Sequence, residues 1–212
     1  LIQRFFTPDL AQVAYAVGDT ATGEVAIIDP RRDVDEYIEW ARRSRLRIVA
    51  ILETHVHADF VSGAIELARA TGAPIYASRL GEQEFDHVPV DDGFTIDIGS
   101  VRLTAIHTPG HTPEHISWRA DIPARPDVNP VLFSGDSLFV GDVGRPDLLG
   151  EDRTDELVDQ LYDMVTNVFK RMPDDVIVYP GHTAGSSCGK NIGDDPHTTI
   201  GREKAMNYAF LP

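Results

Sequence analysis

Hydrophobic positions along the chain recur with two periods, one typical of strands and one typical of helices. Residues 11–30 hold two alternating or β-branched runs, AQVAYAV and EVAIIDP, joined by the turn-like GDTATGE. This pattern predicts a hairpin that opens the domain. Residues 33–43 carry apolar side chains at helical spacing, and RIVAIL at 47–52 is a short apolar run. The segment therefore predicts a strand, a helix and a strand after the hairpin.

The remaining sequence continues this mixture of strands and helices. Residues 64–71 are expected to form a helix that ends at Gly72, and residues 154–170 a long amphipathic helix. Further strands are predicted at 74–78, 93–98, 101–107, 131–136 and 175–182. Residues 121–130 read as a proline-rich loop, and no linker or repeat divides the chain. We therefore expect one domain over residues 1–212 with a layered α/β architecture.

Composition narrows the class of protein. The chain is 42% hydrophobic and 25% charged, as is typical of soluble globular domains. Its net charge of −15 disfavours nucleic acid and anionic membrane surfaces as partners. No apolar run approaches the roughly 18 residues of a membrane span, and LIQRFF lacks the features of a signal peptide. We expect a cytoplasmic protein that binds neither nucleic acid nor membrane.

The cysteine content limits the kinds of cross-link and metal site that the chain can form. Cys188 is the only cysteine, so an intrachain disulfide is excluded and a metal would need mainly histidine and carboxylate ligands. The sequence starts without Met and stops at NYAFLP, which leaves a further domain beyond residue 212 open. A homo-oligomer of identical chains also stays a possibility.

Four segments place histidine or aspartate at or after the end of a predicted strand. They are ETHVHADFVSG at 53–63, TPGHTPEH at 108–115, SGDSLF at 134–139 and YPGHTAG at 179–185. Side chains at strand ends can converge in one cleft, and imidazole with carboxylate suits zinc, iron or manganese. The candidates for this metal site are His55, His57, Asp59, His111, Asp136 and His182.

The motifs THVHADF, HTPGHT, GDSLF and YPGH, in this order, resemble those of the metallo-β-lactamase superfamily over essentially the whole chain. The resemblance implies a four-layer αββα sandwich with metals at one edge of the two sheets. Glyoxalase II and many hydrolases of this superfamily carry HxHxDH, whose last histidine holds a second metal. This chain has Phe60 at that position. Because phenylalanine cannot bind a metal, we expect a weakened second site and one metal with open coordination positions.

Among branches that use one metal, the chain most resembles the persulfide dioxygenases, or sulfur dioxygenases, of sulfide oxidation. GDVGRPDL at 141–148 and AGSSCGKNIG at 184–193 are similar to the dioxygenase module of fusions with rhodanese domains. The resemblance implies a catalytic centre of one non-haem Fe(II) per chain, held by His55, His111 and Asp136, with zinc less favoured. His57, Asp59 and His182 would surround these ligands, and a covalently linked rhodanese domain would follow.

The predicted enzyme oxidises glutathione persulfide, or a related low-molecular-weight persulfide, with O2 to sulfite and thiol. Glutathione-specific members usually keep the histidine that Phe60 replaces, so the thiol that carries the persulfide stays open. One alternative is a glyoxalase II-like thioester hydrolase with zinc or mixed metals, which Phe60 opposes. Another is a non-catalytic sulfur-carrier or interaction domain, which the intact His55, His111, Asp136 and His182 oppose.

Two further residues are candidates for substrate binding. Arg145 can pair bidentately with a carboxylate such as one of glutathione, or form an internal salt bridge with Asp142 or Asp147. Cys188 lies six residues after His182 and can approach the cleft to exchange a sulfane sulfur, or be a buried, inert thiol.

The other histidines and several aromatic residues are not expected to take part in the chemistry. His107 and His115 are predicted to form hydrogen bonds within the scaffold, and His87 and His197 to be exposed. Tyr15, Tyr37 and Trp40 follow the spacing of core residues.

Overall fold

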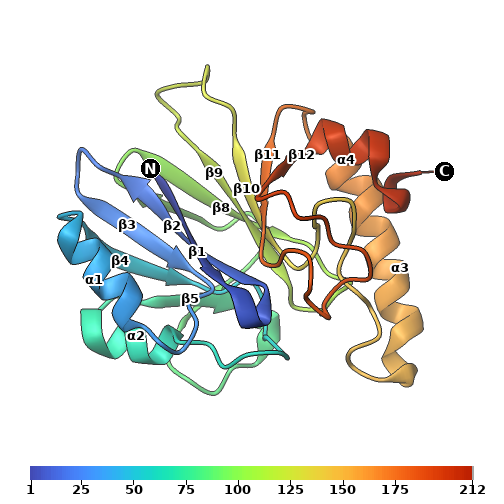
Figure 1. Cartoon of the computed structure of the whole chain (residues 1–212), viewed down its shortest axis with the longest axis horizontal. Helices are drawn as coiled ribbons and strands as arrows, with labels where there is room; N and C mark the ends of the chain where they lie inside the picture. The colour runs from blue at the N-terminus through green and yellow to red at the C-terminus, as the bar shows by residue number, and fades with distance from the viewer. Residues whose placement is uncertain (212) are drawn as a thin grey trace.

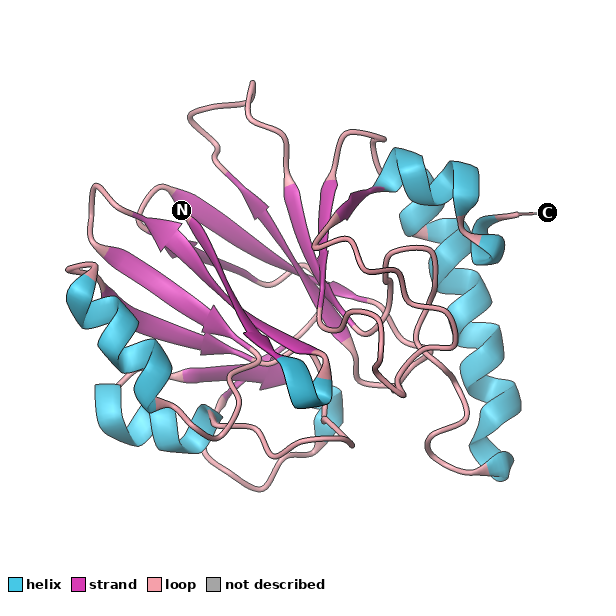
Figure 2. Cartoon of the chain, in the orientation of Figure 1, coloured by secondary structure: helices cyan, strands magenta, loops and turns pink. Residues whose placement is uncertain are grey.

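The computed structural model describes residues 1–211 as two six-stranded sheets with helices on their outer faces (Figures 1 and 2). The first sheet has the order β1-β2-β3-β4-β5-β6, and the second has the order β12-β11-β10-β9-β8-β7. Helices α1 and α2 cover the first sheet, and α3 and α4 lie beside the second. The α/β sandwich expected from the sequence is confirmed.

Each sheet is built from strands that follow one another along the chain. The first sheet consists of β1 (Ile2–Thr7), β2 (Gln12–Asp19), β3 (Glu24–Ile28), β4 (Arg47–Leu52), β5 (Ile75–Ser78) and β6 (Val88–Val90). The second consists of β7 (Thr95–Ile98), β8 (Val101–His107), β9 (Ile116–Asp121), β10 (Val131–Gly135), β11 (Ile177–Pro180) and β12 (Thr198–Thr199). The helices are α1 (Asp35–Arg43), α2 (Ala64–Thr71), α3 (Glu151–Asn167) and α4 (Ile200–Met206).

Every strand and helix predicted from the periodicity is present, but the structure adds β1, β6, β9, β12 and α4. The hairpin of β2 and β3 therefore does not open the sheet, because β1 pairs with β2 before it. The sequence of β9, ISWRAD, alternates apolar and polar residues as a strand does, and β9 pairs with both β8 and β10, so its signal was present in the sequence and was missed. β6 and β12 are too short for a periodic signal.

The core between the two sheets holds large aromatic side chains. Tyr15, Trp118 and Phe133 are each at most 2% exposed and belong to the same hydrophobic cluster. The hydroxyl of Tyr15 donates to the carbonyl of Pro180 at 2.7 Å, and the indole N–H of Trp118 donates to the carbonyl of Glu53 at 3.3 Å. Both bonds link one sheet to the other beside the loops that follow β4 and β11.

Strand direction brings the candidate residues to one edge. β3, β4 and β5 run parallel in the first sheet, and β10 and β11 run parallel in the second. The carboxyl ends of parallel strands meet at the same edge of a sheet, which is where binding sites form in such folds. The segments that follow β4, β10 and β11 contain His55, Asp136 and His182.

No helix among residues 1–211 combines the length and apolar character that crossing a membrane requires.

Candidate metal centre

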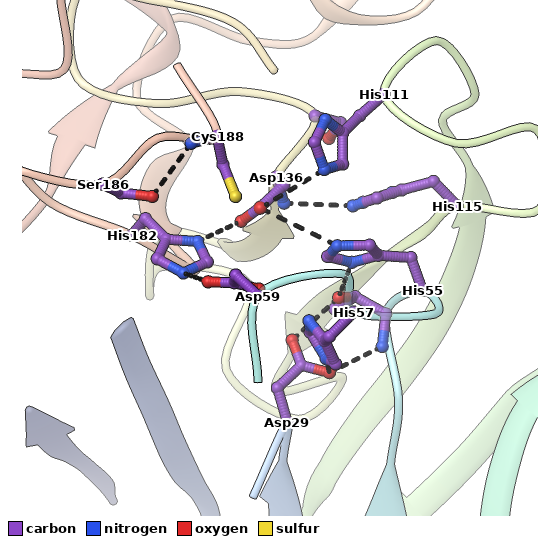
Figure 3. A network of polar contacts seen from close by, with 12 residues as sticks. Asp29, His55, His57, Asp59, His111, His115, Asp136, His182, Ser186 and Cys188 are labelled. Atoms are coloured by element: carbon purple, nitrogen blue, oxygen red, sulfur yellow. Dashed lines mark hydrogen bonds and ion pairs between the residues drawn. The ribbon is translucent and has the colours of Figure 1, made fainter. Parts of the chain in front are cut away.

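His55, His111 and Asp136 converge at the edge of the sandwich (Figure 3). One ligand atom of each lies within 4.8 Å of the others. Nε2 of His55 is 3.7 Å and Nε2 of His111 is 3.5 Å from Oδ2 of Asp136. All three residues are buried. The structure therefore brings together the three residues that the resemblance implied as ligands.

Hydrogen bonds leave the metal-binding nitrogen of each histidine free. Nδ1 of His111 donates to the carbonyl of Arg145 at 2.9 Å. The hydroxyl of Thr54 donates its proton to Oδ2 of Asp29, so the hydroxyl oxygen of Thr54 accepts a hydrogen bond from Nδ1 of His55 at 2.8 Å. Burial, followed by the charge of His57, holds the pKa of His55 well below its ordinary value. Both rings thus use Nδ1 for a hydrogen bond and direct Nε2 toward Asp136, and Nε2 is the nitrogen that would bind a metal.

Asp136 completes a donor set that fits a divalent cation. Its Oδ2, which faces His55 and His111, is buried without a hydrogen-bond partner in the described part of the chain. Burial alone would raise the pKa of Asp136, but the charge and hydrogen bond of His182 hold it well below its ordinary value. A buried ionised oxygen without a donor needs a cation, and two imidazoles with one carboxylate suit iron or zinc.

His115 orients Asp136 from behind. Its Nε2 accepts the backbone N–H of Asp136 at 3.0 Å, so its Nδ1–H donates to Thr108 at 2.9 Å. Burial, followed by the charge of His111, lowers the pKa of His115 to about 3, which keeps the ring neutral. The prediction that His115 belongs to the hydrogen-bonded scaffold is confirmed. Its contact with the main chain of Asp136 had no signal in the sequence.

His182 lies between two carboxylates. Its Nδ1 is 2.7 Å from Oδ1 of Asp136, and its Nε2 is 2.9 Å from Oδ2 of Asp59. Burial would lower the pKa of His182, but the charges and hydrogen bonds of both carboxylates raise it to about 10. In the structure, His182 is therefore a protonated ring that donates to both aspartates and joins Asp59 to Asp136.

His57 points away from Asp136 toward a second acidic pair. Its Nε2 is 3.3 Å from Oδ1 of Asp29 and 3.7 Å from Oε2 of Glu53. Burial would lower the pKa of His57, but the interaction with Asp29 and the charges of Glu53 and Asp136 together raise the pKa to about 9. Burial raises the pKa of Glu53 to about 8. His57 therefore acts in this structure as a buried counter-charge, and neither ring nitrogen makes a hydrogen bond to residues 1–211.

Phe60, which stands where the two-metal pattern has histidine, packs on the ring of His57. The two ring centroids are 4.2 Å apart. Phe60 also lines a cavity of about 360 Å³ that reaches His55 and His57. Val61, Ile65 and Phe85 form much of the remaining wall, so this side of the centre is largely apolar.

Arg145 lies on the other side of the centre, at a cavity of about 540 Å³ that Lys190 and Tyr208 also line. Its guanidinium makes two hydrogen bonds to Asp147, at 2.6 and 2.8 Å. The structure thus contains the internal salt bridge that was the alternative to substrate binding, and it selects Asp147 over Asp142 as the partner. The pair is largely exposed, so it competes weakly with a bound carboxylate.

Cys188 reaches the cleft from the loop after β11. Its sulfur lies within 4.8 Å of a carboxylate oxygen of Asp59 and a ring nitrogen of His182, although the residue is only 3% exposed. Burial, followed by the charges of Asp136 and Asp59, raises the pKa of its thiol. Cys188 therefore lies at the site, as one interpretation of the sequence expected, and its thiol is also buried, as the other expected.

Two glycines allow the backbone to approach this closely. Gly135 has φ +52°, and a Cβ there would lie 2.6 Å from Nε2 of His115. A Cβ on Gly181 would lie 2.8 Å from Oδ1 of Asp136. Larger residues at these positions would displace the carboxylate or the ring that orients it.

The remaining histidines lie outside the centre. His107 bonds through Nε2 to the carbonyl of Pro113 at 2.9 Å, which agrees with its predicted scaffold role. His197 is exposed as predicted. The prediction that His87 is exposed is wrong, because its ring packs edge-on against Phe85 and bonds to the carbonyl of that residue, leaving it half-buried.

Comparison with known proteins identifies the family of this chain. Residues 7–182 match the model of the metallo-beta-lactamase superfamily. A hydroxyacylglutathione hydrolase from Polaromonas sp. strain JS666 is 34% identical over 93% of this chain and 70% of its own length. A metallo-beta-lactamase structure from Staphylococcus aureus has a TM-score of 0.92 and 38% identity over 100% of this chain, which spans 63% of that protein.

The structure of ETHE1 from Myxococcus xanthus has a TM-score of 0.82 and 28% identity, over 98% of this chain and 83% of its own. The resemblance found in the motifs is therefore confirmed at the level of the superfamily. With its two mixed sheets, flanking helices and histidine–aspartate cluster, the chain belongs to the metallo-beta-lactamase superfamily.

Proposed function

We propose that this chain is an Fe(II)-dependent persulfide dioxygenase that acts on glutathione persulfide or a related small persulfide. One observation carries the proposal: two histidines and one aspartate converge on a common point, while phenylalanine occupies the fourth position of the two-metal pattern. Two histidines and one carboxylate on one face of a metal are the donor set of non-haem Fe(II) oxygenases. The likeness to ETHE1 from Myxococcus xanthus over nearly the whole chain supports this branch.

In the proposed reaction, a persulfide, O2 and water give a thiol and sulfite. Both oxygen atoms pass to the outer sulfur, and water then replaces the thiol as the sulfur–sulfur bond breaks. Bound Fe(II) would supply open positions for the persulfide and O2 and would transfer electrons between them. His55, His111 and Asp136 would hold the ion, and the Nδ1 bonds of both histidines would fix their rings.

The surrounding groups have different tasks in this proposal. His182 would hold a proton between Asp136 and Asp59, which keeps Asp136 ionised and in position. Phe60 and the apolar wall beside it would exclude water from one side of the centre. On the other side, Arg145 and Lys190 would offer positive charge to the carboxylates of a substrate such as glutathione persulfide.

Thioester hydrolysis with zinc or mixed metals is the second candidate, because the Polaromonas relative carries the name hydroxyacylglutathione hydrolase. A bound metal ion would there activate water toward the thioester carbonyl. Against it stands the loss of an imidazole at Phe60.

Paired assays on the same preparation separate the two candidates. The chain is reconstituted with Fe(II) or with zinc, and each form is given glutathione persulfide with O2 and, separately, S-lactoylglutathione. The proposal expects O2 uptake by the iron form alone and negligible thioester turnover by either form. Thioester turnover by the zinc form, with no O2 uptake by a fully loaded iron form, would replace it with the hydrolase.

A further inference from the structure

The cavity of about 360 Å³ beside Phe60, the Phe60 cavity, lies between the segments that follow β4 and β5. His55, one of the proposed metal ligands, forms part of its wall. Its apolar lining residues are Val56, Phe60, Val61, Ala64, Ile65 and Phe85. A cavity of this size that is mostly apolar and reaches a candidate ligand is a typical place for a small molecule to bind.

The Phe60 cavity connects an apolar rim with the buried centre. Val56 and Val61 are 51% and 62% exposed, whereas His55 is only 3% exposed. Phe60 follows the same loop inward and packs on the ring of His57, with the ring centroids 4.2 Å apart. A molecule that enters on this side therefore meets mostly side-chain carbon between the surface and His55.

Polar groups contribute little surface to this cavity, although Glu53, His57, Ser62 and Gln83 also line it. The side chains of His57 and Glu53 are only 4% and 6% exposed. The hydroxyl of Ser62 donates to Oε1 of Glu53 at 2.7 Å. Both ring nitrogens of His57 and Oε1 of Gln83 are buried. Water needs several polar partners to be held in a cavity, so these walls favour an apolar occupant.

The Phe60 cavity lies on the opposite side of the centre from Arg145. The ring of His55 lies between those of His57 and His111, at centroid distances of 4.3 and 5.1 Å (Figure 3). Phe60 packs on His57, whereas His111 donates to the carbonyl of Arg145. The two cavities therefore approach the centre from two different sides.

The two cavities also differ in charge. Arg145, Asp147 and Lys190 line the larger cavity. A persulfide anion that entered the Phe60 cavity would lose its hydration without gaining a polar partner, which is unfavourable. Dioxygen is uncharged and apolar, so it loses little on leaving water and gains dispersion contacts with the wall. Among the reactants of the proposed reaction, O2 is therefore the one that suits this cavity.

We propose that the Phe60 cavity binds O2 and delivers it to the centre from the side of His55, while the persulfide enters from the side of Arg145. The identity of the gas rests on the proposed function, because a thioester hydrolase consumes no O2. The preference for an apolar gas rests on the walls alone. Phenylalanine at position 60 keeps the wall apolar, since an imidazole there would bring two polar nitrogens into it.

Xenon tests the cavity without iron or turnover, because it is an uncharged apolar atom that binds in apolar cavities. Crystals of the chain are pressurised with xenon, and its anomalous scattering locates the bound atoms. We expect xenon among Phe60, Ile65 and Phe85. A second cavity, of about 300 Å³, is lined by Ile122 and Val131 at the other end of the sandwich and serves as an internal reference.

Two matched variants each fill one cavity with a larger ring. Both isoleucines are half-buried, so the two substitutions disturb packing to a similar extent. Ile65→Trp should remove xenon from the Phe60 cavity alone, and Ile122→Trp should remove it from the second cavity alone. In the iron-loaded chain, Ile65→Trp should raise KM for O2 by about 10-fold, the effect of losing the fit to one methylene-sized group. KM for the persulfide and iron content should equal those of Ile122→Trp.

Absence of xenon from the Phe60 cavity of the wild type would overturn the proposal, and this result does not require any variant to fold. The same KM for O2 in Ile65→Trp and Ile122→Trp would overturn it as well. Failure of the proposed function gives a different result, namely no O2 uptake by the iron-loaded wild type, whether or not xenon binds.

Discussion

The backbone N–H of Asp136 donates a hydrogen bond to Nε2 of His115 at 3.0 Å. This bond fixes the main chain of a candidate metal ligand, although both ring nitrogens of His115 are taken up by hydrogen bonds to Asp136 and Thr108. His115→Ala removes the acceptor and leaves the N–H of Asp136 buried without a partner. We expect iron affinity to fall by about 10- to 100-fold, as for other residues that orient ligands. Equilibrium dialysis of Fe(II) measures this, and unchanged affinity would show that Asp136 is held without His115.

The three proposed ligands should act as a unit. His55→Ala, His111→Ala and Asp136→Ala each remove one of the converging ligand atoms, so each should abolish bound iron and activity together. His197→Ala changes an exposed histidine outside the centre and serves as the matched control. Iron content and turnover are measured on the same preparations. A variant that keeps one iron per chain and normal turnover would remove its residue from the ligand set.

His57→Ala should separate activity from iron binding. In the structure the ring of His57 faces Asp29 and Glu53, so its loss should leave most iron bound. The loss also leaves the buried Asp29 carboxylate and the neighbouring Glu53 carboxyl without the positive charge that faces both, which should shift the adjoining His55 and reduce turnover. Metal analysis decides between roles: loss of all iron from the variant would make His57 a ligand.

Arg145→Ala should raise KM for a carboxylate-bearing persulfide with little change in iron content. Its exposed pair with Asp147 is easily exchanged for a substrate carboxylate. Arg125 forms the same kind of exposed two-bond pair with Asp127, in the loop after β9, so Arg125→Ala is the matched control. If KM were the same for Arg145→Ala as for Arg125→Ala, Arg145 would only form its salt bridge with Asp147 and would not bind the substrate.

Stability at high pH should depend on Tyr37. Burial raises the pKa of Tyr37 from its ordinary value of 10.0 to about 12. The folded chain therefore binds more protons than the unfolded chain in this range, and the free energy of unfolding falls as pH rises from about 10 to 12. The fall attributable to Tyr37 is at most about 3 kcal/mol. Urea unfolding of the wild type and Tyr37→Phe checks this, and parallel pH profiles would contradict it.

The sequence predicted the fold well because its core strands carry strong periodic signals. Residues 47–52 and 101–107 were found where the pattern placed them. β9 was missed although ISWRAD alternates apolar and polar residues at every position, which is the local signal of a strand. β6 and β12, with three and two residues, are too short to carry such a signal.

At the candidate site, the residues that converge were easier to predict than the partner of each residue. The histidines and aspartates at strand ends converge as expected because parallel strands end at one edge. The pairing of His57 with Asp29 could not be predicted, because the two residues follow different strands, β4 and β3. Asp29 also accepts a hydrogen bond from the backbone N–H of Thr54, which is 25 residues further along the chain. The approach of Cys188 to Asp59 likewise depends on how a long loop folds back over the sheet edge.

The central claim is tested most directly by O2 consumption under defined iron occupancy. The chain is loaded anaerobically with Fe(II), its iron content is measured, and glutathione persulfide is added with a known amount of O2. The account predicts uptake in proportion to bound iron, with one sulfite formed for each O2 consumed. No uptake from the fully loaded chain, with any of several small persulfides, would contradict it.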